Sequence, residues 1–247
     1  MKKSLLILFT GLMAVNSFAG VTARETFDQG KVETKDAVAR RDLLLVKNED
    51  GQAMKVMEWP NQISFPSNTF NLDEGTIEFK VKFSIEPAKI MDKSWSMVRI
   101  YTGKAFTNGF FVIFGWKTGL MFITCDKNGQ RYSLNYPQIR DWKADEWHHV
   151  AVSWKIKNPG ESQLAMVIDY KPVASQSGLT IEFDKDAWRK RTALEAKEKD
   201  LEQKSQEFWD SGGILLGYWG NPMAPEYLVF DDFTIYDTVV TFSEKSL

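Results

Sequence analysis

The segment from Glu146 to Trp154 alternates strictly between two sets of side chains, and this pattern limits what the chain can fold into. Successive side chains of a β-strand point to opposite faces, so every second residue belongs to one face. One face is apolar enough to cover a core and consists of His148, Val150, Val152, Trp154 and Ile156. The opposite face begins with Trp147 and His149. The segment therefore predicts a strand in a domain built from two stacked sheets.

Similar short runs extend from Arg40 to Trp219 and are separated by Gly, Pro, Asn or Asp turns, as in a β-sandwich. Residues 76–83 alternate between apolar and polar side chains, which predicts a sheet with one face in water. Residues 110–114 are apolar on both faces, which predicts either a central strand covered on both sides or a strand that lines a groove. Further strands are predicted at 163–170, closed by Lys171-Pro172, and at 227–236.

A tight hairpin is predicted between residues 120–125 and 130–136. The connecting segment Asp126-Lys127-Asn128-Gly129 ends in Asn-Gly, which supplies the positive φ angles that a tight turn needs. Asp126 and Asn128 also carry oxygen atoms of the kind that bind calcium. The turn alone explains both residues, and no third acidic ligand is near in sequence, so calcium is an alternative that the sequence does not require.

Between Asp184 and Asp210 the apolar period changes from two to about seven residues, which predicts a helix near residues 185–209 inserted into the β domain. Gly212-Gly213 is expected to end this helix. Its thin apolar stripe consists of Ala187, Leu194, Leu201 and Phe208. Two interpretations stay open. The helix lies solvated along one edge of the sandwich, or it docks to another protein or to a second copy, forming a homo-oligomer through Leu194, Leu201 and Phe208.

The first 19 residues have the features of a secretory signal peptide. Two lysines precede the apolar run Leu5 to Val15, and Ser17-Phe18-Ala19 forms the small-x-small ending that precedes cleavage before Gly20. No later stretch approaches the roughly 20 apolar residues of a transmembrane helix, so no membrane span is predicted. We therefore expect an exported product, whether secreted, periplasmic or at the cell surface, with residues 20–247 forming one domain.

Composition argues against several classes of function. The net charge is -2, with lysines and glutamates interspersed, whereas a nucleic-acid partner requires a clustered basic face. The single cysteine, Cys125, allows no internal disulfide. The only histidines are His148 and His149, which excludes a histidine-rich metal centre, and His149 is expected to be a packed imidazole bonded to a loop carbonyl. No metal or cofactor site is predicted.

Three segments carry a family resemblance. The first leads from Gly51-Gln52-Ala53-Met54 through Ile63-Ser64-Phe65-Pro66 to Glu74-Gly75-Thr76-Ile77-Glu78-Phe79. The second is Trp147-His148-His149-Val150-Ala151, which has the form Trp-x-His-Val-Ala. The third is Gly213-Ile214-Leu215-Leu216-Gly217, followed by a closing strand with an Asp-Asp pair at 230–237. Together they resemble the concanavalin A-like lectin and glucanase superfamily, and within it the laminin G-like domains. The resemblance implies an all-β jelly roll of two antiparallel sheets. The helical insertion at 185–210 departs from the family's compact pattern and alters the rim where relatives present ligand-contacting loops.

Some relatives with this fold are glycosidases with a Glu-x-Asp-x-Glu pattern on one strand. The letters recur in Glu198-Lys199-Asp200-Leu201-Glu202, but in the predicted helix Asp200 points roughly 200° away from Glu198, so these carboxylates do not converge. Asp231 and Asp232 are adjacent on a strand, where alternation places them on opposite faces. A structural carboxylate that accepts backbone N–H groups from a neighbouring loop is expected there. No catalytic residue is predicted.

Nine Trp and seven Tyr residues are more than core filling requires. Sugar rings carry C–H groups that stack on flat aromatic rings, so exposed Trp and Tyr side chains form glycan-binding surfaces. The candidate ligand-binding residues lie near turns or strand ends and are Trp95, Tyr101, Trp116, Trp142 and Trp219. Core filling is the competing explanation for each of them.

These observations favour an exported, non-catalytic recognition module for extracellular or cell-surface carbohydrate, or for a surface protein. One alternative is a structural or assembly protein that docks through the inserted helix. The other is a diverged polysaccharide-cleaving enzyme, which needs carboxylates on a concave face at positions that the sequence does not identify.

Overall fold

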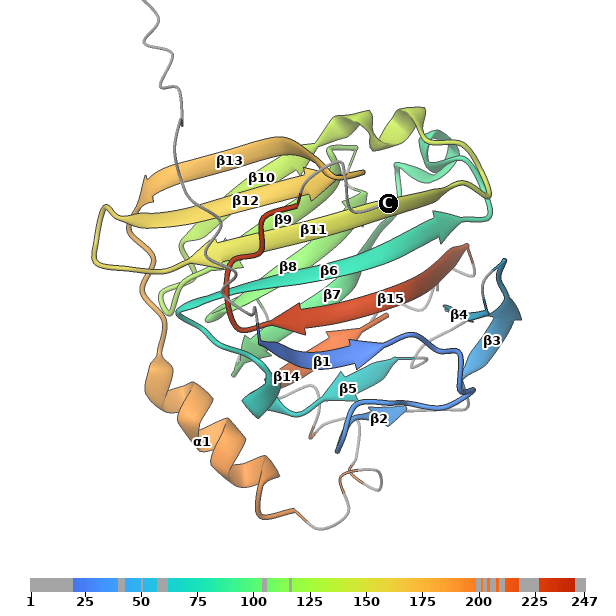
Figure 1. The fold of residues 1–247 in the computed structure, drawn as a ribbon. Coiled ribbons are helices and arrows are strands. Elements are labelled where there is room, and N and C mark those ends of the chain that lie inside the picture. Colours follow the sequence, from blue (N-terminus) through green and yellow to red (C-terminus); the bar gives the residue numbers. More distant parts are fainter. Residues whose placement is uncertain are drawn as a thin grey trace, which may run out of the picture.

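The computed structural model is a β-sandwich of two antiparallel sheets with an α-helix beside it (Figure 1). It describes residues 20–39, 43–49, 51–56, 62–103, 106–115, 117–198, 201, 204, 208, 212–217 and 227–242. The predicted signal peptide lies outside these residues. Among the helices in the described part of the chain, none is long and apolar enough to cross a membrane.

The front sheet, named for its position in Figure 1, contains the two long strands that the sequence predicted most clearly. In spatial order its strands are β13 (Lys171–Leu179), β12 (Ser162–Ile168), β11 (Trp147–Lys155), β6 (Glu74–Phe83), β15 (Leu228–Tyr236), β4 (Gln52–Lys55) and β3 (Leu44–Lys47), and β1 (Val21–Glu25) also pairs with β15. In the β6–β11 ladder Phe79 is opposite Val150 and Ile77 is opposite Val152, and all four side chains are buried. The predicted alternation in these strands is confirmed.

The back sheet lies behind the front sheet in Figure 1 and supplies the other half of the core. In spatial order its strands are β10 (Arg131–Tyr136), β9 (Gly119–Cys125), β8 (Gly109–Gly115), β7 (Ser94–Thr102), β14 (Gly212–Leu216), β5 (Ile63–Phe65) and β2 (Val38–Ala39). Every residue of β8 is buried, as expected for a central strand covered on both sides. The short 3-10 helices η1 (Ser67–Thr69), η2 (Pro87–Ile90) and η3 (Pro137–Asp141) lie in the connections.

Aromatic rings fill the space between the sheets at the end nearest the helix. Phe70 stacks on Trp154 with ring centroids 4.7 Å apart, and Phe110 approaches the same indole at 4.9 Å. The indole N–H of Trp154 donates to the carbonyl of Asn71 over 3.0 Å, so this buried donor is satisfied. Gly75 faces the indole so closely that a Cβ atom at this position would lie 2.4 Å from the Trp154 ring. A glycine is therefore required opposite this tryptophan.

Helix α1 (Lys185–Glu195) is shorter than predicted. The carboxylate of Asp184 accepts from the backbone N–H of Ala187 and caps its first turn. The helix ends at Glu195, whose side chain is buried. Its carboxylate accepts from the Ser67 backbone N–H over 2.6 Å and from Arg191 Nε over 2.6 Å, and all three residues are buried. The prediction of one continuous helix from 185 to 209 is therefore wrong at residues 196–198, which are not helical, and much of the remaining segment lies outside the described residues.

The predicted apolar stripe of the helix is divided between two environments. Leu194 is 44% exposed on α1, whereas Leu201 and Phe208, beyond the helix, pack against a second apolar cluster. This cluster covers the outer face of the back sheet and consists of Tyr101, Phe111, Ile113, Met121, Ile123, Cys125 and Leu215. Arg191 helps to hold the segment, because its Nη1 donates to the Phe208 carbonyl over 2.8 Å. A single continuous stripe through Leu194, Leu201 and Phe208 does not exist.

The expected end of a strand at Lys171-Pro172 is also wrong, since these residues begin β13. The turn lies two residues earlier, at Asp169 and Tyr170, whose φ angles are positive at 48° and 63°, respectively. Such angles normally favour Gly or Asn, so the sequence contained no turn signal here. The two histidines hold this turn. His148 Nδ1 lies 2.9 Å from the Asp169 carboxylate, and the His149 ring stacks on Tyr170.

Candidate functional site

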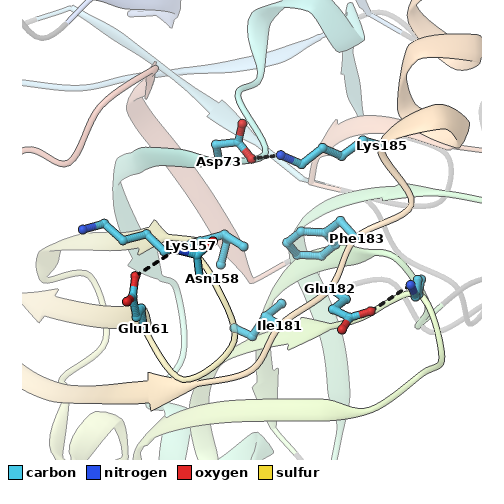
Figure 2. Close-up of a pocket in the computed structure, with 10 residues that line it drawn as sticks. Asp73, Lys157, Asn158, Glu161, Ile181, Glu182, Phe183 and Lys185 are labelled. Atoms are coloured by element: carbon cyan, nitrogen blue, oxygen red, sulfur yellow. Dashed lines mark hydrogen bonds and ion pairs between the residues drawn. The ribbon is translucent and has the colours of Figure 1, made fainter.

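A hollow of about 720 Å³ lies between connecting loops at one end of the sandwich (Figure 2). We call it the loop-end hollow. It is formed by the residue before β6, the β9–β10 turn, the β11–β12 connection and the segment between β13 and α1. Its lining consists of Asp73, Lys127, Ile156, Lys157, Asn158, Glu161, Ile181, Glu182, Phe183 and Lys185. Its volume is in the range of small-ligand sites in proteins.

The middle of the lining is apolar. Figure 2 shows Ile181 and Phe183 surrounded by charged side chains. Ile181 is buried, and Phe183 is partly buried, with its ring 5.0 Å from that of Phe110. The segment 181–183 continues the alternation of a strand after β13 has ended, so Ile181 and Phe183 face the core while Glu182 points outward. One aromatic ring at the edge of the core thus lies under the hollow and packs on the core.

Two ion pairs flank the apolar centre. Lys185 pairs with Asp73, and Lys127 Nζ lies 2.8 Å from Glu182 Oε2 (Figure 2). The hydrogen bond from Lys127 lowers the pKa of the Glu182 carboxyl, and the same contact raises the pKa of Lys127. The backbone N–H of Lys127 also donates to the Glu182 carbonyl over 2.8 Å, which ties the hairpin to the segment before the helix. Both pairs keep lone pairs or N–H groups available for a polar ligand.

The third side of the hollow is the β11–β12 connection. Asn158 Nδ2 donates to Glu161 over 3.4 Å, and Lys157 forms no ion pair within the described part of the chain. The lining therefore carries three lysines and three carboxylates, and its formal charges cancel. The hollow therefore presents charged hydrogen-bond donors and acceptors around an apolar centre.

Asn108 positions the segment that carries Phe183. Its Oδ1 accepts from the Asp184 backbone N–H over 2.6 Å, and its Nδ2 donates to the Asp184 carbonyl over 3.2 Å. Asn108 is buried at the start of β8 and also donates to Thr102 Oγ1. Both backbone groups at the helix entrance are thus satisfied by one amide, so the loop is fixed to the back sheet.

A second, smaller hollow of about 300 Å³ lies on the outer face of the front sheet, near Glu78. The Glu78 carboxylate accepts from Tyr236 Oη and lies 3.2 Å from His149 Nε2. The imidazole of His149 is buried between this carboxylate and Tyr170, whose ring lies 4.2 Å away. The prediction that His149 bonds to a loop carbonyl is therefore wrong. Burial and the bond to Glu78 raise the pKa of Tyr236.

The aspartate pair on β15 differs from the prediction. A register shift between Asp231 and Thr234, with Asp232 at a φ of 49°, interrupts the alternation of the strand. Asp231 is paired in register with Lys80, and Asp232 Oδ2 lies 2.8 Å from Lys80 Nζ, so both carboxylates lie on the outer face. Asp231 accepts from its neighbour's backbone N–H and from Asn48 Nδ2. Burial first, and the charge of Asp232 second, raise the pKa of Asp231 to about 6.

Three of the five aromatic residues predicted to contact a ligand are buried. Trp95, Tyr101 and Trp142 are 2%, 1% and 6% exposed, and Trp116 and Trp219 lie outside the described residues. Trp95 packs on Phe114, Tyr101 belongs to the cluster outside the back sheet, and Trp142 stacks on His148. Their position near strand ends led to the prediction that they are exposed. That prediction failed because the sequence does not show which segments cover a strand end. Phe183 was missed, although it follows Ile181 at strand spacing.

The predicted Asp126 turn is confirmed. Its Oδ1 accepts from the backbone N–H groups of Asn128 and Gln130, each over 2.8 Å. In the portion of the chain that the structure describes, no group of three or more His, Cys, Asp or Glu residues is arranged to hold a metal ion.

No protein-family model matches this sequence, and no curated protein sequence matches it. Solved structures do resemble its fold. The binding domain of Paraclostridial Mosquitocidal Protein 1 is 11% identical with a TM-score of 0.61, over 89% of this chain and 49% of that one. The receptor binding domain of botulinum neurotoxin C/D mosaic serotype is 10% identical with a TM-score of 0.61, over 89% and 48%.

A third similar structure is the botulinum neurotoxin serotype D ligand binding domain in complex with N-acetylneuraminic acid. It is 10% identical with a TM-score of 0.55, over 83% of this chain and 43% of that one. The present chain thus spans about half the length of these domains or less. At such identities the likeness establishes the β-sandwich fold alone.

Proposed function

We propose that this protein is an exported, non-catalytic recognition module of the concanavalin A-like, laminin G-like type, and that it binds extracellular or cell-surface carbohydrate in the loop-end hollow. The observation that carries the proposal is the combination in Figure 2: one partly exposed aromatic ring, Phe183, between two lysine–carboxylate pairs whose charges cancel.

The chemistry of this lining matches a saccharide. A sugar ring presents an apolar C–H face and a rim of hydroxyl groups. Phe183 offers a ring for the C–H face. The carboxylates of Asp73 and Glu182 accept from hydroxyl groups, and the paired ammonium groups donate to them. Because the formal charges of the lining cancel, we expect an uncharged saccharide rather than an acidic one.

The structural neighbours support the class of function, not the ligand. They are receptor-binding or ligand-binding domains, and one was solved with N-acetylneuraminic acid. Localisation in a secreted, periplasmic or cell-surface setting rests on the signal peptide predicted at residues 1–19. A cell-surface protein is the other partner that such a module would recognise.

The two alternative functions have weaker support. An assembly role through the inserted helix would require an exposed apolar stripe, but Leu201 and Phe208 pack against the protein's own back sheet. A polysaccharide-cleaving enzyme would require free carboxylates facing each other. Glu78 and Asp232 do line the outer-face hollow, yet Glu78 is bonded to Tyr236 and His149, and Asp232 is paired with Lys80.

A glycan array followed by titration calorimetry tests the proposal. We expect Phe183→Ala to weaken the binding of the best neutral glycan about two- to tenfold, because stacking contributes about 0.5–1.5 kcal/mol. Glu182→Gln should weaken it too, whereas Val173→Ala, an exposed position on the edge strand β13, should leave it unchanged. A folded protein that binds no glycan would overturn the proposal. Loss of binding on Tyr170→Ala but not on Phe183→Ala would move the site to the outer-face hollow.

A further inference from the structure

Gly20 lies beside Asp237 where β1 begins and β15 ends. The Asp237 backbone N–H donates to the Gly20 carbonyl over 3.1 Å, and the Gly20 nitrogen donates to Asp237 Oδ1 over 3.1 Å. These bonds extend the β1–β15 ladder, in which Val21 is opposite Tyr236. Asp237 therefore holds Gly20 through both its main chain and its side chain.

The Asp237 carboxylate lies against the Cα atom of Gly20. A Cβ atom at this position would lie 2.8 and 2.9 Å from the two carboxylate oxygens. Real Cβ atoms do not approach other atoms so closely, so any larger residue would displace the carboxylate. The close approach of the two groups depends on glycine at position 20.

Among the described residues, the Asp237 carboxylate differs from other carboxylates of the front sheet in its partner. On the same sheet the carboxylate of Asp232 is paired with Lys80, and that of Glu74 with Lys155. Within the described part of the chain, no lysine, arginine or histidine is paired with Asp237. The backbone carbonyl of Asp237 accepts from Asn71 Nδ2 over 3.2 Å.

We propose that the cation for Asp237 is the α-ammonium group of Gly20, created when the chain is cleaved between Ala19 and Gly20. Hydrolysis of this peptide bond consumes one water, leaves a carboxylate on Ala19 and an amine on Gly20, and the amine takes up a proton at neutral pH because its ordinary pKa is about 8. The nitrogen that donates to Asp237 as a neutral amide then donates as a charged group. Charge-assisted hydrogen bonds are roughly twice as strong as neutral ones.

Cleavage would thus strengthen the attachment of β1 to the end of β15, which already exists in the uncleaved chain. This matters for the fold because β1 carries the buried residues Ala23 and Glu25. The Glu25 carboxylate accepts from the backbone N–H groups of Glu33 and Thr34, so β1 in turn organises the segment that follows it. The inference rests on the predicted signal peptide and is independent of carbohydrate binding.

Four chains test the ion pair. Two begin at Gly20 and two begin at Ala19, and one of each two carries Asp237→Asn. Starting at Ala19 moves the ammonium group by one residue without changing the net charge. In the chain that begins at Gly20, we expect Asp237→Asn to lower the melting temperature by about 1–4 °C. In the chain that begins at Ala19 the loss should be clearly smaller. Equal losses in both backgrounds would overturn the proposal.

Two further measurements keep the test decisive. If Asp237→Asn does not fold, the two unsubstituted chains are compared, and the one that begins at Gly20 must melt at the higher temperature. The full chain is also expressed in a host that exports it, and its intact mass is determined. We expect the mass of residues 20–247. A mature product that begins at any other residue would exclude the proposed pair, whatever the glycan experiments show.

Discussion

Asp231 is the carboxyl group whose protonation is expected to change near neutral pH. Burial and the neighbouring Asp232 raise its pKa to about 6 from an ordinary value of 3.8. A raised pKa means that the folded protein binds the proton more tightly than the unfolded chain does. The associated stabilisation is therefore complete below about pH 3.8 and is lost as the pH rises through about 6.

We expect the carboxyl signal of Asp231 to titrate with a midpoint near 6 in a carbon-detected NMR experiment. Asp232→Asn should lower the midpoint, because it removes the negative charge that opposes ionisation. Lys80→Met should raise it, because it removes the nearby cation. A midpoint near 4 in the unsubstituted protein would contradict the burial of this group.

The same pair shows the limit of strand periodicity at the level of single residues. Alternation placed Asp231 and Asp232 on opposite faces, and the register shift on β15 brought both to Lys80. A bulge depends on how two strands pair, so the sequence of one strand does not specify it. The side-chain bond of Asp126 within its own turn is local and was predicted.

At the scale of elements, α1 and the residues beyond it form a cover for the back sheet. Arg191 and Glu195 join the helix to Ser67 and to Phe208, and Leu201 packs on the cluster outside the back sheet. The segment is therefore part of the fold of this chain.

Leu201→Lys is expected to destabilise the protein by about 1–3 kcal/mol, because it places a charge against an apolar cluster. Leu194→Lys is the matched control. Leu194 is exposed on the helix, so its substitution should change stability by less than about 0.5 kcal/mol. Urea unfolding with sedimentation velocity measures both effects. A Leu201→Lys protein that keeps its stability but loses a dimer would favour the assembly role instead.

The helix was predicted correctly in kind and wrongly in length. Its start was visible, since Asp184 is a favoured N-cap residue. Its end was not, because residues 196–210 continue the charged, apolar-striped pattern of a helix. The chain leaves the helix where Glu195 reaches Ser67, which is 128 residues away in sequence. A contact of that range has no local signal.

At the scale of the whole molecule, the two hollows lie on different surfaces, one between loops at the end of the sandwich and one on the outer face of the front sheet. Hydrogen exchange with and without saturating saccharide should distinguish them. We expect slower exchange in residues 157–161 and 181–185, because a bound ligand suppresses local opening there. Exchange at Asp169 and Tyr170, beside the outer-face hollow, should not change. The reverse pattern would contradict the proposed site.

The sequence by itself determined the layers of this protein. Strand alternation, the Asn-Gly hairpin and the helix start depend on neighbours within a few residues. The strands β6, β8, β9, β10, β11 and β15 lie where these local signals predicted strands, although a register shift interrupts the alternation of β15. Tertiary structure alone decided the site. Whether Trp95, Tyr101 and Trp142 are buried, and whether Phe183 lies under a hollow between ion pairs, depends on which distant segments pack over each ring. Burial is a property of the packed sheets, and a strand's own sequence fixes which side chains share a face, not what covers that face.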